Sequence, residues 1–204
     1  MAISMNKIWW DGVWYNNPVF RQVLGICSTL AVTNLVVNTG VMCLGLIYAQ
    51  ALSSMTASAL RTITPHRLRI ISSTLIMAAY VIVLHIVLQA FVPDISAQLG
   101  PYVGLIITNC ILLGRVEAFA TQNKIWPSLV DGVSCGVGYS IILLAIAVVR
   151  EFLGFGTIAG VAIPLEFTRW TIMVTAPGAF FMLAIVVWVV RFIGMAGETS
   201  QQKN

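Results

Sequence analysis

Six apolar stretches, separated by short polar segments, run through the chain. They are, in order, roughly Gln22–Val37, Gly40–Leu60, Ile70–Val92, Pro101–Leu113, Gly132–Val149 and Trp170–Ile193. A helix that crosses the hydrocarbon core of a membrane needs about 20 apolar residues. The pattern therefore predicts an all-α integral membrane protein with six transmembrane helices.

The first and fourth stretches are shorter than a full crossing and contain polar side chains. These are Ser28, Thr29, Thr33 and Asn34 in the first, and Thr108 and Asn109 in the fourth. Short, polar-interrupted segments at corresponding places in two halves of a membrane protein indicate broken helices and an internal binding site. We therefore expect helices one and four to be short or broken.

The six stretches divide into two halves of three. An odd number of spans makes the second half enter the membrane from the opposite side, which predicts an inverted repeat. Repeat one would cover about 18–92 and repeat two about 101–193, within a single membrane domain of residues 1–204. A short match supports the repeat, since Pro18 precedes Cys27, and Pro101 precedes Cys110, by nine residues. Sites in such proteins lie near the midplane, where the halves meet.

The composition agrees with a membrane protein and leaves no room for a separate soluble domain. Of the 204 residues, 59% are hydrophobic and 9% are charged, and the mean hydropathy is +0.93. A soluble domain carries about 25% charged residues. The basic residues are dispersed among the loops, so the net charge of +4 does not indicate nucleic-acid binding.

The distribution of basic residues predicts the orientation in the membrane. With the N-terminus in the cytoplasm, nine basic residues lie inside, and only Arg150 and Arg169 lie outside. The positive-inside rule therefore favours a cytoplasmic N-terminus and a cytoplasmic C-terminus. The N-terminal segment carries Trp9, Trp10 and Trp14 where a signal peptide would have its apolar core, which is typical of an interfacial anchor.

Cys27 and Cys110 are the candidate ligands of a metal centre. Thiolates suit iron–sulfur clusters, and a [2Fe–2S] cluster takes four cysteines, of which this pair supplies two. A single iron held by four thiolates would fit the same pair. The alternative is packing, because a free cysteine in an apolar helix behaves as a small hydrophobic side chain. Cys43 and Cys135 lie outside the two short spans, and we expect both to be packing residues.

Thr108 and Asn109, next to Cys110, are weaker candidates for the same site. They are placed to orient a cluster or to donate hydrogen bonds to its sulfur atoms. Hydrogen bonds between helices would also explain them.

Ionisable residues near the ends of spans form a further set of candidates. They are Arg115, Glu117, Asp131, Arg150 and Glu151, together with His85 in the third span and Asp94 just beyond it. Such groups can line an ion path, relay protons or contact a partner subunit. The commoner explanations are a charge pair at a helix end, a side chain that reaches the membrane interface, and a satisfied polar contact.

The chain lacks the usual nucleotide-binding motifs. It has no Gly-x-Gly-x-x-Gly fingerprint, no Walker motif and no twin-histidine haem arrangement. We therefore predict no catalytic residues, and a chain that is not a complete enzyme on its own.

Several strings resemble the paired membrane subunits of the sodium-translocating NADH:quinone oxidoreductase and of its relative, the Rnf complex. They are Val23-Leu-Gly-Ile-Cys-Ser-Thr-Leu-Ala-Val-Thr33, Val103-Gly-Leu-Ile-Ile-Thr-Asn-Cys-Ile-Leu-Leu-Gly-Arg-Val-Glu-Ala-Phe-Ala120, Asp131-Gly, Gly136-Val-Gly-Tyr139, Arg150-Glu-Phe-Leu-Gly-Phe-Gly156 and Pro177-Gly-Ala-Phe-Phe181. The resemblance covers nearly the whole chain. The two cysteine strings are most similar to the D subunit of the quinone reductase, whereas the start of the chain, Trp10 to Pro18, is similar to the E subunit of the Rnf complex.

The resemblance implies a multi-pass subunit of the bacterial inner membrane that packs antiparallel against a homologous six-helix subunit, within a six-subunit complex. Each of the two would contribute two cysteines to one intramembrane [2Fe–2S] cluster, and the matching positions here are Cys27 and Cys110. The cluster would relay electrons across the membrane, coupled to Na⁺ transport, while flavins, NADH and quinone would bind to other subunits.

Other functions fit the same spans. One is the equivalent subunit of the Rnf ferredoxin:NAD⁺ oxidoreductase. A second is a cofactor-free transporter with inverted repeats, which would tolerate serine at Cys27 and Cys110. A third is a scaffold for partner subunits, in which such substitutions would disturb assembly and leave any cluster intact.

Overall fold

The computed structural model describes residues 9–10, 12, 24–91, 93–155, 157–158, 161–162 and 175–201. Its main helices are α3 (Ile26–Val32), α4 (Val36–Leu60), η2 (His66–Leu68), α5 (Arg69–Phe91), α6 (Pro93–Ile107), α7 (Cys110–Arg115), the π-helix η3 (Val116–Ala120), α8 (Ile125–Phe155) and α10 (Ala176–Gln201). Two short strands, β1 (Thr157–Ile158) and β2 (Val161–Ala162), pair antiparallel after α8. Apart from this hairpin, the described part of the chain is helical, as the sequence predicts.

Four helical segments are long and apolar enough to cross a membrane. They are Val36–Leu60, Arg69–Phe91, Tyr102–Ala120 and Ile125–Phe155, and a shorter apolar helix covers Pro177–Val190. The second, third and fifth predicted spans thus correspond to α4, α5 and α8. The last predicted span corresponds to α10, although its residues 170–174 lie outside the described part. The chain is a multi-pass membrane protein.

The first predicted span, Gln22–Val37, is wrong in extent. Only Ile26–Val32 forms its helix, α3; the chain then turns at Thr33 and Asn34, and Val36 already begins α4. Residues 22–23 lie outside the described part. The polar residues at the end of the stretch form the break between two helices.

The fourth predicted span, Pro101–Leu113, consists of parts of two helices. Pro101–Ile107 belongs to α6, which begins earlier, at Pro93, and α7 begins at Cys110. The break lies at Thr108 and Asn109, where the polar interruption predicts it.

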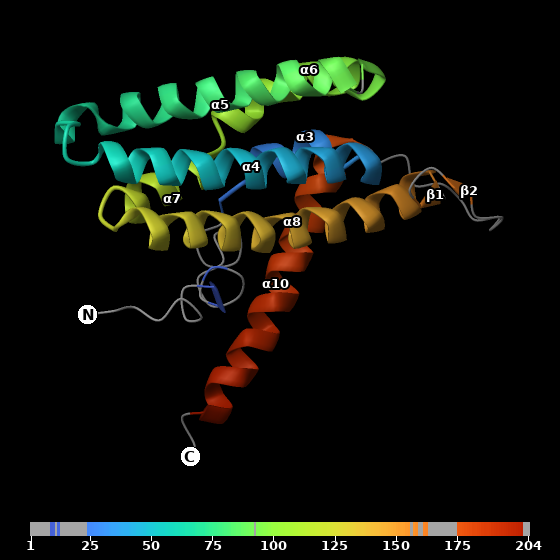
Figure 1. The fold of residues 1–204 in the computed structure, drawn as a ribbon. Helices are drawn as coiled ribbons and strands as arrows, with labels where there is room; N and C mark the ends of the chain where they lie inside the picture. The colour runs from blue at the N-terminus through green and yellow to red at the C-terminus, as the bar shows by residue number, and fades with distance from the viewer. Residues whose placement is uncertain are drawn as a thin grey trace.

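The long helices α4 and α8 run antiparallel, side by side, and form the largest helix–helix interface (Figure 1). A Cβ atom on Gly132 would lie 3.0 Å from the Gln50 carbonyl oxygen, and one on Gly136 would lie 3.1 Å from Cγ1 of Ile47. Small residues at membrane interfaces let helix backbones approach closely, and van der Waals packing then holds them together. Side chains of α8 link this interface to the short helices, since Tyr139 of α8 bonds to Ser28 of α3.

The remaining helices surround this pair. α5 and α6 pack against each other and against α4, whereas α10 contacts α3 and α8 and crosses the bundle obliquely (Figure 1). Much of the apolar surface of α5 is exposed, including Ile71 and Leu75. An exposed apolar surface of this kind needs lipid or another chain around it.

Candidate functional site

The two short helices bring Cys27 and Cys110 together. Cys27 lies in the first turn of α3, and Cys110 is the first residue of α7. The two thiols are neighbours, because the first turns of α3 and α7 meet where the N–H of Gly25 faces Sγ of Cys110. The side chain of Cys27 is exposed and that of Cys110 is partly buried. Two thiols thus meet at one edge of the chain.

Gly25 joins the two helix starts. Its N–H donates to Sγ of Cys110 at 3.0 Å, across 85 residues of sequence. Its φ of 83° lies in the left-handed region, which glycine adopts without strain. A Cβ atom at this position would lie 2.6 Å from Cδ1 of Ile111 and 2.8 Å from Cε2 of Tyr139. Glycine is therefore the residue that allows this N–H to face the sulfur.

A buried cluster of hydroxyl groups fixes the Gly25 peptide. Its carbonyl oxygen accepts hydrogen bonds from the hydroxyls of Ser28 at 3.2 Å, Thr29 at 2.9 Å and Tyr139 at 3.2 Å. Ser28 and Tyr139 also hydrogen-bond to each other. Buried polar groups are costly unless they are paired, so this cluster holds the start of α3 in one conformation.

The position of Tyr139 indicates the depth of the site. Tyr139 lies near the middle of α8, a helix of 31 residues. Such a helix is about 46 Å long, which exceeds the roughly 30 Å hydrocarbon core of a bilayer. The hydroxyl cluster and the two thiols therefore lie far from both ends of the bundle.

Asn109 caps the helix that carries Cys110. It is fully buried; its Oδ1 accepts the N–H of Ile111 at 2.9 Å, and its Nδ2 donates to the Ser28 hydroxyl at 3.3 Å. The first bond is an N-cap, and the second ties α7 to α3. By contrast, Thr108 is exposed, and its hydroxyl donates to the Gly104 carbonyl of its own helix at 3.1 Å. Asn109 therefore positions the thiol, whereas Thr108 bonds to its own backbone.

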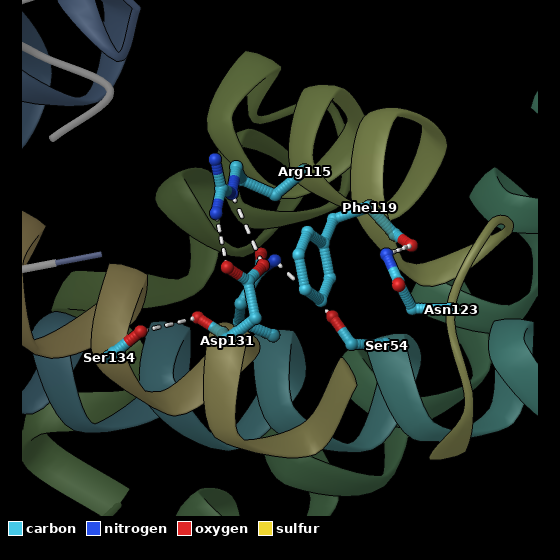
Figure 2. Close-up of polar contacts among 7 residues, drawn as sticks. Ser54, Arg115, Phe119, Asn123, Asp131 and Ser134 are labelled. Carbon is cyan, nitrogen blue, oxygen red and sulfur yellow. Dashed lines mark hydrogen bonds and ion pairs between the residues drawn. The ribbon is translucent and has the colours of Figure 1, made fainter. Parts of the chain in front are cut away.

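Arg115 and Asp131 form an ion pair between α7 and α8. Nε of Arg115 donates to one carboxylate oxygen of Asp131 at 3.2 Å, and Nη2 binds the other (Figure 2). The guanidinium carbon also lies 5.6 Å from the centre of the Phe119 ring. The two side chains are only 12% and 3% exposed. The sequence suggests a charge pair of Arg115 and Glu117 at the end of their own helix; the structure shows a largely buried pair in which Arg115 reaches across to Asp131 of another helix.

Arg150 and Glu151 hold the break between α3 and α4. Nη1 of Arg150 donates to the Thr33 hydroxyl at 2.6 Å, and a carboxylate oxygen of Glu151 accepts the N–H of Val36 at 2.6 Å. Arg150 is 2% exposed and Glu151 is 1% exposed. The expectation that both reach the membrane interface is therefore wrong. The first N–H groups of a helix have no partner within it, and Glu151 supplies one for α4.

The other candidates lie apart from the thiols. Cys43 and Cys135 are buried, and the Cys43 thiol donates to the Ser140 carbonyl at 3.8 Å, which agrees with a packing role. His85 lines a small apolar pocket between α4, α5 and α6. One oxygen of Glu117 is buried without a hydrogen-bond partner in the described part. The Asp94 side chain lies outside the described residues.

Sequence reasoning missed the roles of Gly25 and Tyr139. A tyrosine inside an apolar span is a usable signal, because a buried phenol hydroxyl needs a hydrogen-bond partner. The partner itself, a carbonyl oxygen at the start of α3, cannot be read from spacing.

Comparison with known proteins gives a consistent result. Residues 5–187 match the family described as "Rnf-Nqr subunit, membrane protein". The D subunit of the Na⁺-translocating NADH-quinone reductase of Photobacterium profundum is 43% identical over 196 residues, which is 93% of either chain. The proteins of the same name from Aeromonas hydrophila and Chlamydia felis are 42% and 40% identical over 194 residues, and in both cases at least 90% of either chain is covered.

Proposed function

This chain belongs to the Rnf-Nqr family of membrane subunits, and we propose that it is the D-type subunit of a Na⁺-translocating NADH:quinone reductase. In this role it carries electrons across the bacterial inner membrane, and electron flow is coupled to Na⁺ transport. NADH, flavins and quinone bind to other subunits. The names of the similar proteins support the quinone reductase over the Rnf complex.

The observation that carries the proposal is the meeting of Cys27 and Cys110 at the first turns of two half-helices, far from both ends of the bundle. A packing role would not need a glycine in the left-handed region whose N–H donates to one of the sulfur atoms. Hydrogen bonds to sulfur are a known means by which proteins tune iron–sulfur centres.

The two thiols fit one half of a [2Fe–2S] cluster. Such a cluster takes four cysteine ligands, and in the described part of the chain no group of three or more Cys, His, Asp or Glu residues comes together. The exposed side chain of Cys27 places the pair at an edge that a second subunit can cover. When bound, the cluster supplies a one-electron carrier. Cys27 and Cys110 would hold it, and Gly25 would donate to one sulfur.

The partner that completes this site is a homologous six-helix subunit in antiparallel orientation. The antiparallel α4–α8 pair and the two half-helices support an inverted repeat of about 18–92 and 101–193 within a single domain. Arg61 donates to the Gln122 carbonyl at 3.2 Å, so the linkers 61–68 and 121–124 lie at the same end of the bundle. This end carries the basic residues Arg61, Arg67, Lys124 and Arg69, the first residue of α5. This end would be cytoplasmic, with both termini on the same side.

The coupling to Na⁺ has a physical rationale. Reduction adds negative charge in an apolar medium, which is costly unless a cation approaches. Na⁺ transport should therefore depend on the thiol pair, and transport that persists after loss of the cluster would contradict the coupling.

The test of this function is the iron and acid-labile sulfide content of the purified complex. Cys27→Ser and Cys110→Ser should each remove the two iron atoms of one [2Fe–2S] cluster and stop quinone reduction by NADH. Cys43→Ser and Cys135→Ser are matched controls and should keep the iron, because both cysteines are buried and neither joins Cys27 and Cys110 in a group of three ligands within the described part of the chain. Unchanged iron and turnover in all four variants would favour a cofactor-free transporter or a scaffold.

Tyr139→Phe should lower the midpoint potential of the cluster. The change removes a donor to the Gly25 carbonyl and so loosens the peptide whose N–H faces Cys110. One net hydrogen bond contributes about 0.5–1.5 kcal/mol, so the expected shift in a redox titration is roughly 20–60 mV for one electron. Tyr80→Phe is the control, because the Tyr80 hydroxyl bonds to Thr56 instead, at 2.7 Å. Equal midpoint potentials in wild type and both variants would mean that the hydroxyl groups around Gly25 do not influence the potential of the iron–sulfur cluster.

A further inference from the structure

A second polar site lies where α4 ends and α5 begins. It is a small pocket, open to the surface, whose polar lining consists of Arg61, Thr64, Arg69, Ser72, Ser73 and Thr121. These residues come from the end of α4, the 61–68 linker, the first turns of α5 and the turn after η3. The pocket is thus built by one continuous stretch, 57–73, and by Thr121, which is distant in sequence.

The lining of this pocket has the chemistry of an anion site. Two arginines, Arg61 and Arg69, line it, and none of its lining residues is acidic. One nitrogen of Arg61, Nη1, donates to the Gln122 carbonyl at 3.2 Å. Within the described part of the chain, Nε of Arg69 is buried and has no hydrogen-bond partner. A buried charged donor without an acceptor is costly, so an anion that accepts from it would bind with a gain in free energy.

The hydroxyl groups and the helix start add to this preference. Ser72 and Ser73 lie near the start of α5, a helix of 23 residues, where the helix dipole also favours negative charge. Arginine binds phosphate oxygens with its planar fork of N–H donors, and serine hydroxyls can donate further hydrogen bonds. The side chains that line this surface pocket therefore suit a phosphate group that binds at its mouth.

The surroundings of the pocket favour a lipid as the source of that phosphate. The pocket lies at the ends of α4 and α5, which are both membrane-spanning, and thus at the depth of lipid headgroups. Apolar residues close to the two arginines in sequence are exposed: Ile63 is 81% exposed, Ile70 is 58% exposed and Ile71 is 66% exposed. A free phosphate ion would make no use of this apolar surface, whereas acyl chains would cover it.

We propose that this surface pocket, which we call the Arg61–Arg69 pocket, binds the phosphodiester headgroup of an anionic phospholipid, with the acyl chains along the exposed face of α5. Basic pockets between transmembrane helices on the cytoplasmic side bind such headgroups in other membrane proteins. The site is independent of the cysteine pair.

Native mass spectrometry of the purified complex, titrated with phosphatidylglycerol in detergent at about 150 mM salt, tests the proposal. Arg69→Gln should lower the apparent affinity about tenfold, because it removes a charge-assisted hydrogen bond. Ser72→Ala should lower it about threefold, and it keeps the charge of the pocket. Arg67→Gln is the matched control, since Arg67 belongs to the same linker, is exposed and does not line the pocket. Its effect should stay within about twofold at this salt concentration.

The intact mass of each variant complex verifies that it assembles. Equal affinities of wild type, Arg69→Gln and Ser72→Ala, or equal losses in Arg69→Gln and Arg67→Gln, would overturn the site. Inorganic phosphate should fail to displace the lipid at equal concentration; if it competes as well as the lipid, the pocket binds free phosphate and the proposed ligand is wrong. Phosphatidylethanolamine should bind more weakly than phosphatidylglycerol, and equal binding of the two would also count against an anionic ligand.

Discussion

Gly25→Ala should destabilise the protein by about 3 kcal/mol and disrupt the site at the same time. An L-residue in the left-handed region costs roughly 1–2 kcal/mol, and forcing a methyl group into a packed site costs about 1–3 kcal/mol more. The methyl group would meet Ile111 and the ring of Tyr139, at 2.6 and 2.8 Å. The backbone must then move, and with it the N–H that donates to Cys110. Thermal melting of the purified complex, followed by iron analysis, measures both effects.

The chain offers a matched control for this substitution. Gly104 lies in α6, shortly before the break at Thr108 and Asn109, and a Cβ atom there would have no neighbour within 4 Å. Gly104→Ala should therefore leave melting and iron content unchanged or slightly improved, since alanine favours a helix over glycine. A Gly25→Ala complex that melts and binds iron like the Gly104→Ala complex would show that the left-handed turn is not required.

Asp131→Ala should have an effect of similar size by a different mechanism. The substitution removes one member of a buried ion pair and leaves the Arg115 guanidinium without its carboxylate partner. Breaking a buried pair from one side costs about 3–5 kcal/mol, which corresponds to a fall in melting temperature of roughly 10 °C for a chain of this size. Melting of the purified complex is again the measurement.

The double variant Arg115→Met with Asp131→Leu separates the two possible roles of this pair. Replacing both charges by apolar side chains is often neutral for stability, so the double variant should melt near the wild type. A double variant that melts normally but has lost turnover would mean that the charges act in function. If the complex with Asp131→Ala alone melts like the wild type, the ion pair does not stabilise the contact between α7 and α8.

The sequence predicts the membrane class, the family and the two interrupted helices, and the comparisons confirm the family. These features depend on hydrophobic length and on polar residues within apolar stretches, which are local properties. Thr108 and Asn109 mark the break before α7, and Thr33 and Asn34 mark the break after α3, because short polar side chains satisfy the backbone where a helix stops.

The sequence does not predict which distant side chains form hydrogen bonds with the residues at these helix breaks. Arg150 and Glu151 look like ordinary charges at a span end, and only the packing of α8 against the start of α4 shows that they are buried. The sequence does not predict the pairing of Arg115 with Asp131 either, because the two residues lie on different helices. Each depends on the crossing of two helices, and the spacing within one helix carries no information about its neighbour.

The most direct measurement is the low-temperature EPR spectrum of the reduced, assembled complex. Our account predicts that Cys27→Ser and Cys110→Ser abolish one and the same iron–sulfur signal, whereas Cys135→Ser, which changes a buried cysteine outside the pair, retains it. A spectrum that retains every signal in both Cys27→Ser and Cys110→Ser would contradict the assignment of these thiols as cluster ligands.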